Sequence, residues 1–305
     1  MEKDRVDSLL KMPIMDLVAE ANRIRDKFAG KEIDLCTIIN AKSGFCPEDC
    51  KFCAQSNRHS TGIKTYALKK KEEMFEAAIR AKEIGADRFD IVTSGDKLSD
   101  DDFNTILDVI REITAKIKIK MCASLGSMDE DRLSLLKKSG LTRYHHNIES
   151  SARFFPKIVT THTFQERINT IKAAKKCGLE VCSGGIIGMG EDMQDRIEMA
   201  LTLKELNVDS VPINILVPIK GTLMESRPLL SAQEAVRTIA IFRIILEGKT
   251  IKIAAGRESA LKDFQALAFM AGANGMLIGG YLTIKGRSVD EDWRLVEEVK
   301  KLWLA

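Results

Sequence analysis

The fold is decided by two neighbouring stretches of the chain, Ile33-Asp-Leu-Cys-Thr-Ile-Ile-Asn40 and, six residues further on, Cys46-Pro-Glu-Asp-Cys50-Lys-Phe-Cys53. The first is an apolar run typical of a buried β-strand. The second places three cysteines on one short loop with the spacing C-x3-C-x2-C. Enzymes built on barrels of parallel strands carry their chemistry in the loops that follow the strands. The order of strand and cysteine loop therefore predicts a reactive centre at the end of a first barrel strand.

Beyond this unit, short β-like runs alternate with longer helical ones. The expected strands are Ile33–Asn40, Arg88–Thr93, Ile117–Ser124, Arg143–Ile148, Glu180–Ile187, Ser210–Val217, Ile251–Ala255 and Met276–Gly279. The expected helices are Lys70–Ile84, Asp101–Ala115, Glu130–Ser139, Thr163–Cys177, Met193–Leu206, Ala232–Leu246 and Ser259–Ala271. Eight strands that alternate with helices predict an α/β fold, a parallel (β/α)8 barrel of the TIM type. An open doubly wound sheet is the alternative.

The 305 residues suit one barrel domain, and no linker or low-complexity stretch marks a boundary. We expect residues 1–30 to form a helical N-terminal extension and residues 31–305 to form the barrel. A net charge of +3 is too small to indicate binding to nucleic acid or to an anionic membrane surface. No apolar run reaches the roughly 18 residues of a membrane helix, and the acidic N-terminus does not fit a secretion signal. Seven cysteines without an export signal predict the reducing cytoplasm.

The three loop cysteines supply soft thiolate ligands, which select zinc, Cu(I) or iron–sulfur clusters. A structural zinc site needs a fourth ligand, and His59 is the nearest candidate. A cubane cluster held by three cysteines keeps one iron open to a substrate. In its spacing, and with Phe52 directly before Cys53, the loop resembles that of the radical S-adenosylmethionine (SAM) superfamily. The resemblance implies a barrel enzyme that uses a [4Fe–4S] cluster and SAM.

Further stretches resemble the biotin synthase family within that superfamily. They appear in the family's order and cover the chain from about Thr37 to about Gly280. They are Gly44-Phe-Cys-Pro-Glu-Asp-Cys-Lys-Phe-Cys-Ala-Gln-Ser56, Tyr144-His-His-Asn-Ile-Glu149, Thr160-Thr-His-Thr-Phe-Gln-Glu-Arg167, Val181-Cys-Ser-Gly-Gly185, Val211-Pro-Ile-Asn214 and Ala255-Gly-Arg-Glu258.

The resemblance implies roles for the residues around the loop cluster. Cys46, Cys50 and Cys53 would hold the [4Fe–4S] cluster, whose open iron chelates the amino and carboxylate groups of SAM. Arg167 would pair with the SAM carboxylate, because a planar guanidinium suits a carboxylate. A glycine-rich stretch on the fifth strand would pack against the adenine. Its matching residues are Gly184, Ile186, Gly188 and Glu191, and Phe52 adds an aromatic ring beside the cluster.

Three more residues are implied around the SAM ribose and the substrate. Asn147 and Glu149 would contact both, although the family usually has Asp where this chain has Glu149. Asn214 would bind the ureido ring of dethiobiotin, since an amide offers both a donor and an acceptor. Taken without the resemblance, Asn147 and Asn214 fit strand-end positions that cap local backbone.

The family's second cluster, a [2Fe–2S] sulfur donor, is held by three strand cysteines and an arginine. Cys122, Cys182 and Arg257 match three of these ligands, but the second-strand cysteine is replaced by Asp90. Cys36 lies on the first strand, where the family usually has serine. We therefore expect Cys36, Cys122, Cys182 and Arg257 to hold an auxiliary cluster of altered geometry, with two or four irons. Loss of this cluster is the alternative.

Two cysteine positions raise separate questions. Cys122 shares a strand face with Lys118 and Lys120, which are unusual inside a barrel. Those lysines lie either at the open start of the strand or beyond a bulge. Cys177, at the end of a helical run, is expected to be a small buried hydrophobe without a role in chemistry.

The implied activity is the insertion of sulfur into dethiobiotin by a radical SAM transferase. An electron donor of the flavodoxin or ferredoxin type and a homodimer are the family's expected partners. Other radical SAM barrels, such as a hydrogenase maturase or a methylornithine synthase, are alternatives that would share the SAM-binding residues. A non-catalytic iron–sulfur carrier or a structural zinc protein is an alternative of another class, and it has no use for Arg167 or the glycine-rich strand.

Overall fold

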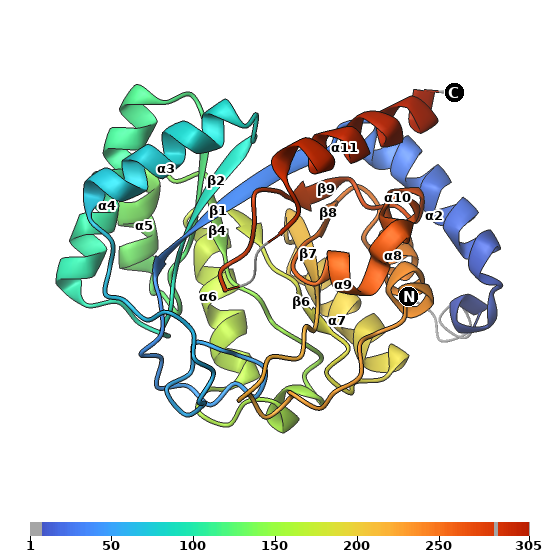
Figure 1. The fold of residues 1–305 in the computed structure, drawn as a ribbon, viewed down its shortest axis with the longest axis horizontal. Helices are drawn as coiled ribbons and strands as arrows, with labels where there is room; N and C mark the ends of the chain where they lie inside the picture. Colours follow the sequence, from blue (N-terminus) through green and yellow to red (C-terminus); the bar gives the residue numbers. More distant parts are fainter. Residues whose placement is uncertain (1–7, 284–285, 305) are drawn as a thin grey trace.

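A closed barrel of parallel strands forms the centre of the molecule (Figure 1). The computed structural model describes residues 8–283 and 286–304. Its strands are β1 (Asp34–Lys42), β2 (Arg88–Thr93), β3 (Lys120–Ser124), β4 (Arg143–His145), β5 (Glu180–Cys182), β6 (Gly185–Ile187), β7 (Ser210–Ile215), β8 (Thr250–Ile253) and β9 (Gly275–Leu277). They follow the order β5-β4-β3-β2-β1-β9-β8-β7-β6 around the barrel.

The barrel closes where β5 and β6 meet β7. These two segments are halves of the single strand predicted over Glu180–Ile187. Cys182 of β5 pairs in parallel with Ser210 of β7, which joins the two ends of the sheet. The break between the halves falls at Gly184, where a Cβ atom would lie 2.0 Å from the carbonyl oxygen of Pro212 on β7. When β5 and β6 are counted as one strand, the barrel has eight strands. The predicted eight-stranded barrel is therefore confirmed, and the open sheet is excluded.

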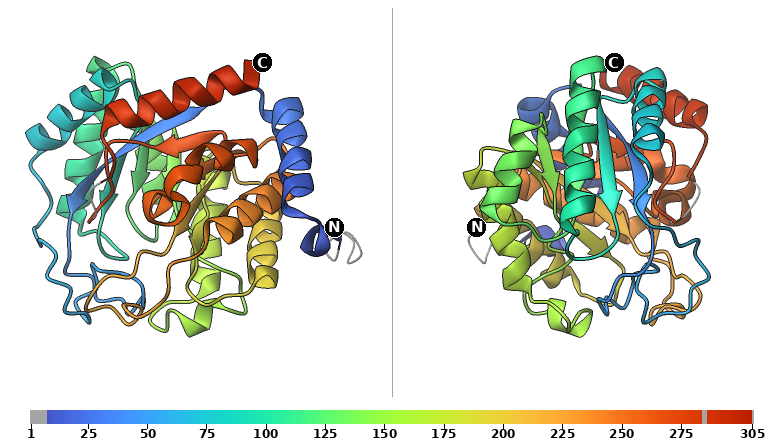
Figure 2. Two further views of the ribbon diagram at one scale, coloured as in Figure 1. Left: turned by 45° about the vertical axis from the view of Figure 1, so that its right-hand side comes forward. Right: turned by 90° about the vertical axis from the view of Figure 1, so that its left-hand side faces the viewer.

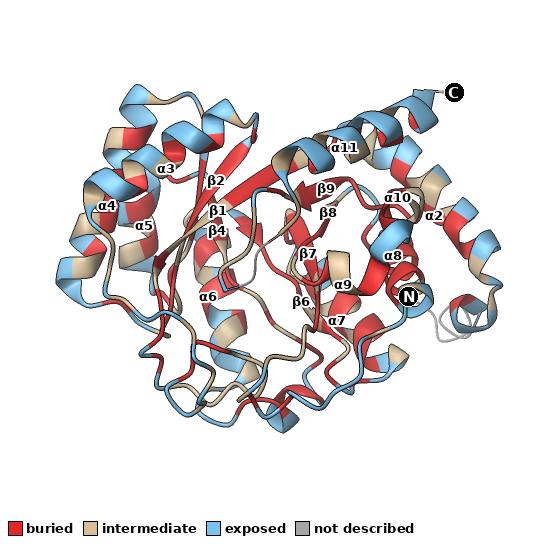
Figure 3. Cartoon of the chain, viewed as in Figure 1, coloured by how far each residue is buried: buried red, intermediate tan, exposed pale blue. Residues whose placement is uncertain are grey.

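Helices surround the barrel, with buried inner faces and exposed outer faces (Figures 2 and 3). The helices are α2 (Ile14–Ala29), α3 (Lys71–Glu83), α4 (Asp100–Lys116), α5 (Glu130–Lys138), α6 (Phe164–Lys176), α7 (Met193–Glu205), α8 (Ala232–Leu246), α9 (Arg257–Leu261), α10 (Gln265–Met270) and α11 (Val289–Leu304). Short 3-10 turns lie at Phe155–Lys157 and Lys262–Phe264. The first six predicted helices are confirmed, with ends that differ by at most one residue. Across the described ranges no helix is long and apolar enough to cross a bilayer.

The predicted N-terminal extension is helical in its described part. Its helix α2 packs against α8, which is buried along nearly its whole length from Ala235 to Leu246. A helix that is apolar on all sides needs a cover on the side that faces away from the barrel. The extension supplies that cover. Residues 1–7 of the predicted extension lie outside the described residues.

The single helix predicted over Ser259–Ala271 is wrong. The chain instead forms α9, a 3-10 turn and α10. Lys262 ends α9 with a φ of 48°, a left-handed conformation that does not continue a helix. Across this break, Gln265 of α10 donates a hydrogen bond to the Lys262 carbonyl at 3.3 Å and accepts one from Arg257 of α9. These contacts stabilise two short helices in place of one long helix.

The last helix, α11, is not among the predicted elements. Its apolar positions recur at helical spacing and bury Val296, Val299 and Trp303. The guanidinium carbon of Arg25 on α2 lies 3.9 Å from the centroid of the Trp303 ring. Helices from the two ends of the chain therefore lie side by side (Figures 1 and 2).

Five charged side chains close the N-terminal end of the barrel. Asp34 lies 3.2 Å from Arg88 and 3.3 Å from Arg143. It also lies 3.0 Å from Lys252. Glu180 lies 3.1 Å from Arg88 and 2.9 Å from Arg143. The three cations are buried, and buried cations need paired carboxylates. We call these five residues the ionic floor.

We predict that Asp34→Asn lowers the free energy of unfolding by about 3 kcal/mol at pH 7, because it leaves buried cations uncompensated. Burial alone would raise the pKa of Asp34, but the charges of Lys252, Arg88 and Arg143 outweigh burial and lower it to about 2. An unfolded aspartate titrates near 3.9, so the wild-type advantage is present above about pH 4 and is lost as the pH falls through about 2. Chemical denaturation of both proteins at several pH values measures it.

The matched control is Asp108→Asn, which removes a carboxylate that is 59% exposed in its pair with Arg111. Exposed pairs contribute at most about 1 kcal/mol. Equal stabilities for the Asp34 and Asp108 variants would contradict a structural role for the ionic floor.

Candidate active site

A cavity of about 410 Å³ lies inside the barrel, at the C-terminal ends of the strands. Its wall combines the cysteine loop with inward-facing strand residues. The loop contributes Cys46, Cys50, Phe52 and Cys53, and the strands contribute Cys36, Asp90, Cys122, Cys182 and Lys252, among others. Both predicted sets of three cysteines therefore face one cavity. A volume of this size is typical of a small-molecule site.

The cysteine loop is anchored to the segment before α6. The Asp49 carboxylate accepts hydrogen bonds from the backbone N–H groups of Thr160 at 2.8 Å and Thr161 at 3.2 Å. The Lys51 N–H donates to the Ile158 carbonyl at 3.0 Å. Desolvation opposes ionisation of Asp49, but the combined hydrogen bonds from Thr160 and Thr161 outweigh it and hold the pKa of Asp49 well below the usual range. An ionised Asp49 thus holds the loop at the mouth of the cavity.

The loop thiols suit a positively charged metal group. Burial raises the pKa of the Cys53 thiol to about 11, and burial with the charge of Cys53 raises that of Cys50 further. Burial also raises the pKa of Cys46. Thiolates so placed are favoured by bound cationic metal. His59, the candidate fourth zinc ligand, instead contacts the Cys50 carbonyl through Nε2 at 3.1 Å.

A chain of contacts links the cysteine loop to Arg167. The Glu48 carboxylate lies 2.6 Å from His162 Nδ1, and His162 Nε2 lies 3.0 Å from Arg167 Nη1. Because a guanidinium can only donate, Nε2 accepts and Nδ1–H donates to Glu48. Arg167 also donates to the carbonyl of Asn147 and lies 3.4 Å from Glu149. The guanidinium therefore has a defined position in the cavity wall.

The start of α6 brings Arg167 to this position. Thr163 and Glu166 form a capping box, in which Glu166 accepts from the Thr163 N–H at 2.6 Å and donates its own N–H to the Thr163 hydroxyl at 3.2 Å. Arg167 follows in the first turn and lines the cavity. It is therefore not an exposed helix arginine.

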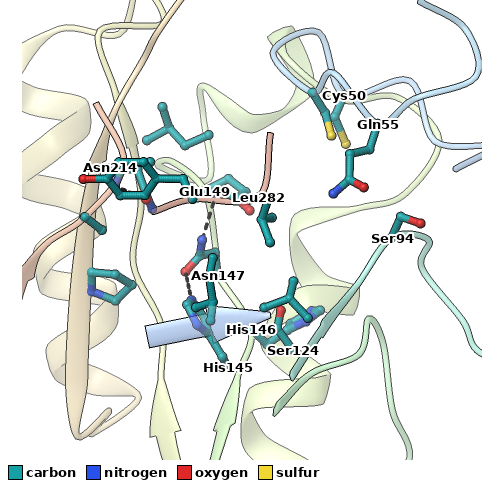
Figure 4. Close-up of a pocket in the computed structure, with 18 of the residues that line it drawn as sticks. Cys50, Gln55, Ser94, Ser124, His145, His146, Asn147, Glu149, Asn214 and Leu282 are labelled. Carbon is teal, nitrogen blue, oxygen red and sulfur yellow. Dashed lines mark hydrogen bonds between the residues drawn. The ribbon is translucent and has the colours of Figure 1, made fainter. Parts of the chain in front are cut away.

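Asn147 connects the deep and outer parts of the cavity (Figure 4). Its Oδ1 accepts from the Gly184 N–H at 3.1 Å and lies 3.1 Å from His145 Nε2. Its Nδ2 donates to Glu149 at 3.5 Å. Glu149 has a φ of 66°, a costly conformation for a non-glycine residue that clusters at functional sites. Burial raises the pKa of Glu149, although the charge of Arg167 opposes the shift.

The residues of the glycine-rich stretch have two roles: one lines the cavity, and the others fix the backbone around it. Ile186 lines the cavity. Glu191 instead accepts from the N–H groups of Gly188 and Met189, both at 2.7 Å. Gly184 allows the close approach of β7 described above. Of these residues, Ile186 is the one that presents its side chain to a ligand, and the others shape the backbone around it.

Asn214 lines the cavity from β7. Its Nδ2 donates to the Gly185 carbonyl at 3.3 Å, and its Oδ1 accepts from the Ala255 N–H at 3.2 Å. Both contacts are to the backbone around neighbouring strands. An amide has a second N–H and a second lone pair, so Asn214 also keeps capacity for a ligand.

The strand cysteines lie deep in the cavity. Cys36, Cys122 and Cys182 are free and buried, and all three line the cavity. Lys118 and Lys120 are exposed, and Lys120 is the first residue of β3. The lysines thus lie at the open start of the strand, which resolves the conflict in the strand pattern without a bulge.

Comparison with known proteins places the chain in a family. Residues 41–215 match the family model of the radical SAM superfamily, and residues 212–300 match that of the Biotin and Thiamin Synthesis associated domain. A biotin synthase of Thermotoga petrophila is 52% identical over 299 residues, which cover 98% of this chain and 99% of the relative. The chain belongs to the biotin synthase family. A biotin synthase of Carboxydothermus hydrogenoformans is 51% identical over 94% of this chain and 89% of the relative.

Members of the biotin synthase family are radical SAM enzymes, and membership implies a [4Fe–4S] cluster and SAM. Solved structures show the fold more widely. A methylornithine synthase superposes with a TM-score of 0.84 at 21% identity, covering 97% of this chain and 92% of that protein. An FeFe-hydrogenase maturase from Carboxydothermus hydrogenoformans superposes with a TM-score of 0.80 at 18% identity, covering 93% of this chain and 70% of that protein. At these identities the likeness shows the fold alone.

Arg257, expected as an auxiliary-cluster ligand of the biotin synthase family, is buried, and its Nη2 donates to the carbonyl of Leu277, the register partner of Cys36, at 3.4 Å. It lies 2.7 Å from Asp292 of α11 and 3.3 Å from Glu258, and it does not line the cavity. Arg257 begins α9, beyond the end of β8, where its side chain reaches the C-terminal helix. The cations that do line the cavity beside the cysteines are Arg143 and Lys252.

Several residues of this biotin synthase family site were not predicted as site residues from the sequence. Among them are Arg143, His145, His162 and Lys252. A signal for Lys252 was available, because a single lysine between Ile251 and Ile253 must face either the core or the barrel interior. His145 and His162 lie in stretches that matched the family, but the contacts of these histidines depend on distant segments.

We predict that Asp49→Ala loosens the cysteine loop, because it removes the bonds to the N–H groups of Thr160 and Thr161. Hydrogen bonds to a charged group contribute about 1.5–3 kcal/mol, so amide exchange over residues 46–56 should accelerate about tenfold or more. Hydrogen exchange followed by mass spectrometry measures this. Glu73→Ala, at the exposed start of α3, is the control and should leave the loop unchanged. Unaltered exchange in the Asp49 variant would show that the anchor is unimportant.

Proposed function

We propose that this chain is a biotin synthase, which inserts sulfur between two unactivated carbons of dethiobiotin. One observation carries the proposal. Three loop thiols and three strand thiols line a single cavity inside the barrel, as a reaction that joins radical generation to sulfur donation requires. The names of the relatives that share about half of their residues with this chain support the same activity.

The loop cysteines Cys46, Cys50 and Cys53 would hold the [4Fe–4S] cluster. When bound, the two clusters supply the electron that cleaves SAM and the sulfur that enters the product. Arg167 would bind the SAM carboxylate from its position beside the cysteine loop. Asn147 and Glu149 would bind the ribose. The SAM adenine would lie against Ile186, between the backbone at Gly184 and Gly188, with the Phe52 ring beside the cluster.

Dethiobiotin would lie between the two sets of cysteines. Its ureido ring offers a carbonyl acceptor and N–H donors, which the free capacity of the Asn214 and Asn147 amides can satisfy. The apolar part of the cavity wall, including Ile186, suits its alkyl carbons. The chain thus holds the reacting carbons away from water, which protects a radical from side reactions.

Cys36, Cys122 and Cys182 would hold the auxiliary cluster, with two or four irons. Lys252 and Arg143 line the same part of the cavity and offset the negative charge of thiolates and sulfide. Arg257, whose side chain is buried and donates to the Leu277 carbonyl on the strand beside Cys36, stays the predicted arginine ligand. The further expectations also remain part of the proposal, namely a flavodoxin- or ferredoxin-type electron donor, a homodimer, a cytoplasmic location and one domain over residues 1–305.

The test is an anaerobic reaction of reconstituted protein with SAM, a strong reductant and dethiobiotin. Biotin formed together with 5′-deoxyadenosine supports the proposal. Deoxyadenosine without biotin, in protein with its iron content verified, would leave a radical SAM enzyme with another substrate. Neither product would favour an iron–sulfur carrier.

We predict that Arg167→Lys raises the dissociation constant of SAM about tenfold, or about 1.4 kcal/mol. Lysine keeps the charge but loses the planar pair of donors that fits a carboxylate. Isothermal titration of cluster-loaded protein measures the affinity. Arg153→Lys is the control, since Arg153 pairs with Asp192 at the surface. SAM affinity that does not change in the Arg167 variant would remove this residue from the SAM site.

We predict that Cys36→Ser lowers the auxiliary iron content and abolishes biotin formation while deoxyadenosine formation continues. A serine hydroxyl is a poor substitute for a soft thiolate ligand. Cys177→Ser is the matched control, because the Cys177 thiol contacts Ser134 and the Glu130 carbonyl away from the cavity. Iron and sulfide analysis with product quantification measures both. Wild-type iron and biotin in the Cys36 variant would exclude Cys36 from the cluster.

A further inference from the structure

His162 lines the cavity between the cysteine loop and Arg167. Its ring meets a partner at each nitrogen, because Nδ1 lies 2.6 Å from the Glu48 carboxylate and Nε2 lies 3.0 Å from Arg167 Nη1. All three side chains are largely buried, with 9% of His162, 16% of Glu48 and 14% of Arg167 exposed. A hydrogen bond in such surroundings is stronger than one in water. His162 is therefore placed to control where the guanidinium lies.

Only one form of the His162 ring fits these two contacts. A guanidinium donates and never accepts, so Nε2 carries the lone pair that receives the Arg167 N–H. Nδ1 must then carry the ring proton and donate it to Glu48. A ring with one proton is neutral. His162 thus meets the guanidinium as an uncharged acceptor.

The surroundings of the ring fix its direction. The Phe155 ring meets it edge to face, with centroids 5.7 Å apart and planes at 66°. Phe155 belongs to a small buried apolar cluster, against which Cys50 of the cysteine loop also packs. The Glu48 carboxylate is held in turn by the Thr161 hydroxyl. The acceptor that His162 offers to the guanidinium therefore has a defined position before any ligand binds.

The contacts of Arg167 leave part of its donor set for a ligand. A guanidinium has five N–H groups. One bonds the Asn147 carbonyl, one bonds His162, and one faces Glu149 at 3.4 Å. Among the described contacts this leaves two N–H groups, one on each terminal nitrogen. Two is the number that a carboxylate accepts from a guanidinium in a bidentate pair.

The neutrality of His162 decides what Arg167 can bind. A carboxylate placed directly on the guanidinium would offset its charge and compete with the carboxylate of a ligand. His162 instead keeps the charge of Glu48 on the far side of the imidazole ring. The carboxylate that the described residues do place beside the guanidinium, Glu149, lies at 3.4 Å, longer than the roughly 2.7–2.9 Å of a strong charged bond. Arg167 is thus held in place while it keeps charge for a ligand.

We propose that His162 is a positioning residue that aims Arg167 at the SAM carboxylate, which rests on the SAM site of the proposed function. Glu48 lies between the first two loop cysteines and fixes the form of the His162 ring. The pair therefore ties recognition of the SAM carboxylate to the loop that would hold the cluster. In this role His162 acts through the guanidinium and not by contact with SAM.

Binding of two ligands to cluster-loaded protein, without reductant, separates this role from a structural one. SAM carries the carboxylate, and decarboxylated SAM has the same nucleoside, sulfonium and amino groups without it. Isothermal titration gives the dissociation constant of each ligand. His162→Leu leaves a buried Arg167 donor without its acceptor, so it should raise the dissociation constant of SAM about tenfold. The affinity for decarboxylated SAM should stay unchanged, whereas a merely structural role would weaken both ligands.

Two further variants test the chemistry of the ring. His162→Gln offers a neutral side-chain carbonyl to Arg167 and should keep the affinity for SAM within about twofold of the wild type. His162→Glu places a carboxylate on the guanidinium, and it should weaken SAM more than His162→Leu does.

A double-mutant cycle shows whether His162 acts through Arg167. Arg167→Met is made alone and together with His162→Leu. If the guanidinium carries the effect, His162→Leu should cause no further loss of SAM affinity in the Arg167→Met protein.

Three results overturn the proposal alone. They are wild-type SAM affinity in His162→Leu, an equal loss for SAM and decarboxylated SAM, and a full effect of His162→Leu in the Arg167→Met protein, which would mean direct contact with SAM. Each of them leaves biotin formation as proposed. A wild-type protein that holds its iron but binds no SAM instead removes the SAM site of the proposed function, and the role of His162 with it.

Discussion

Charge buried at the ionic floor is the constraint on which the rest of the barrel depends. Three cations on β2, β4 and β8 are held by two carboxylates, Asp34 on β1 and Glu180 on β5. None of the three buried cations is stable alone in the interior. Their pairing therefore ties strands that are distant in the chain, at one level of the barrel, and it sets the register from which the cavity above is built.

The cavity residues lie directly above the ionic floor, toward the C-terminal ends of the strands. Inward-facing positions on a strand recur every second residue, so the residue two positions after each floor residue also faces the barrel interior. Asp34 is followed by Cys36, Arg88 by Asp90, and Glu180 by Cys182. The floor carries three cations against two carboxylates, an excess of one positive charge beneath a layer of thiols. Burial favours a neutral Lys252, but the charges of Cys36 and Asp34 outweigh it and raise its pKa.

Hydrogen bonds between loops, and not strand pairing, fix the outer end of the cavity. The cysteine loop is not part of the sheet, and its position depends on hydrogen bonds to a segment about 110 residues away. Glu48 and Asp49, which lie between the first two loop cysteines, make those bonds. The loop that would hold a cluster is thus coupled directly to His162 and Arg167. This arrangement connects the proposed cluster ligands and the proposed SAM-binding residue through hydrogen bonds.

The sequence by itself determined the barrel, the cysteine loop and the family, because strand periodicity and motif spacing are local properties of the chain. It also predicted that Cys36, Cys122 and Cys182 face a common site, because their strands converge in any closed barrel. Tertiary structure alone decided the contacts of Asp90 and Arg257. Arg257 pairs with Asp292 on a helix that the sequence analysis did not predict. Asp90 on β2 contacts His145 on β4, with β3 between them. Which buried charge pairs with which depends on register and on distant helices, and no local pattern encodes either.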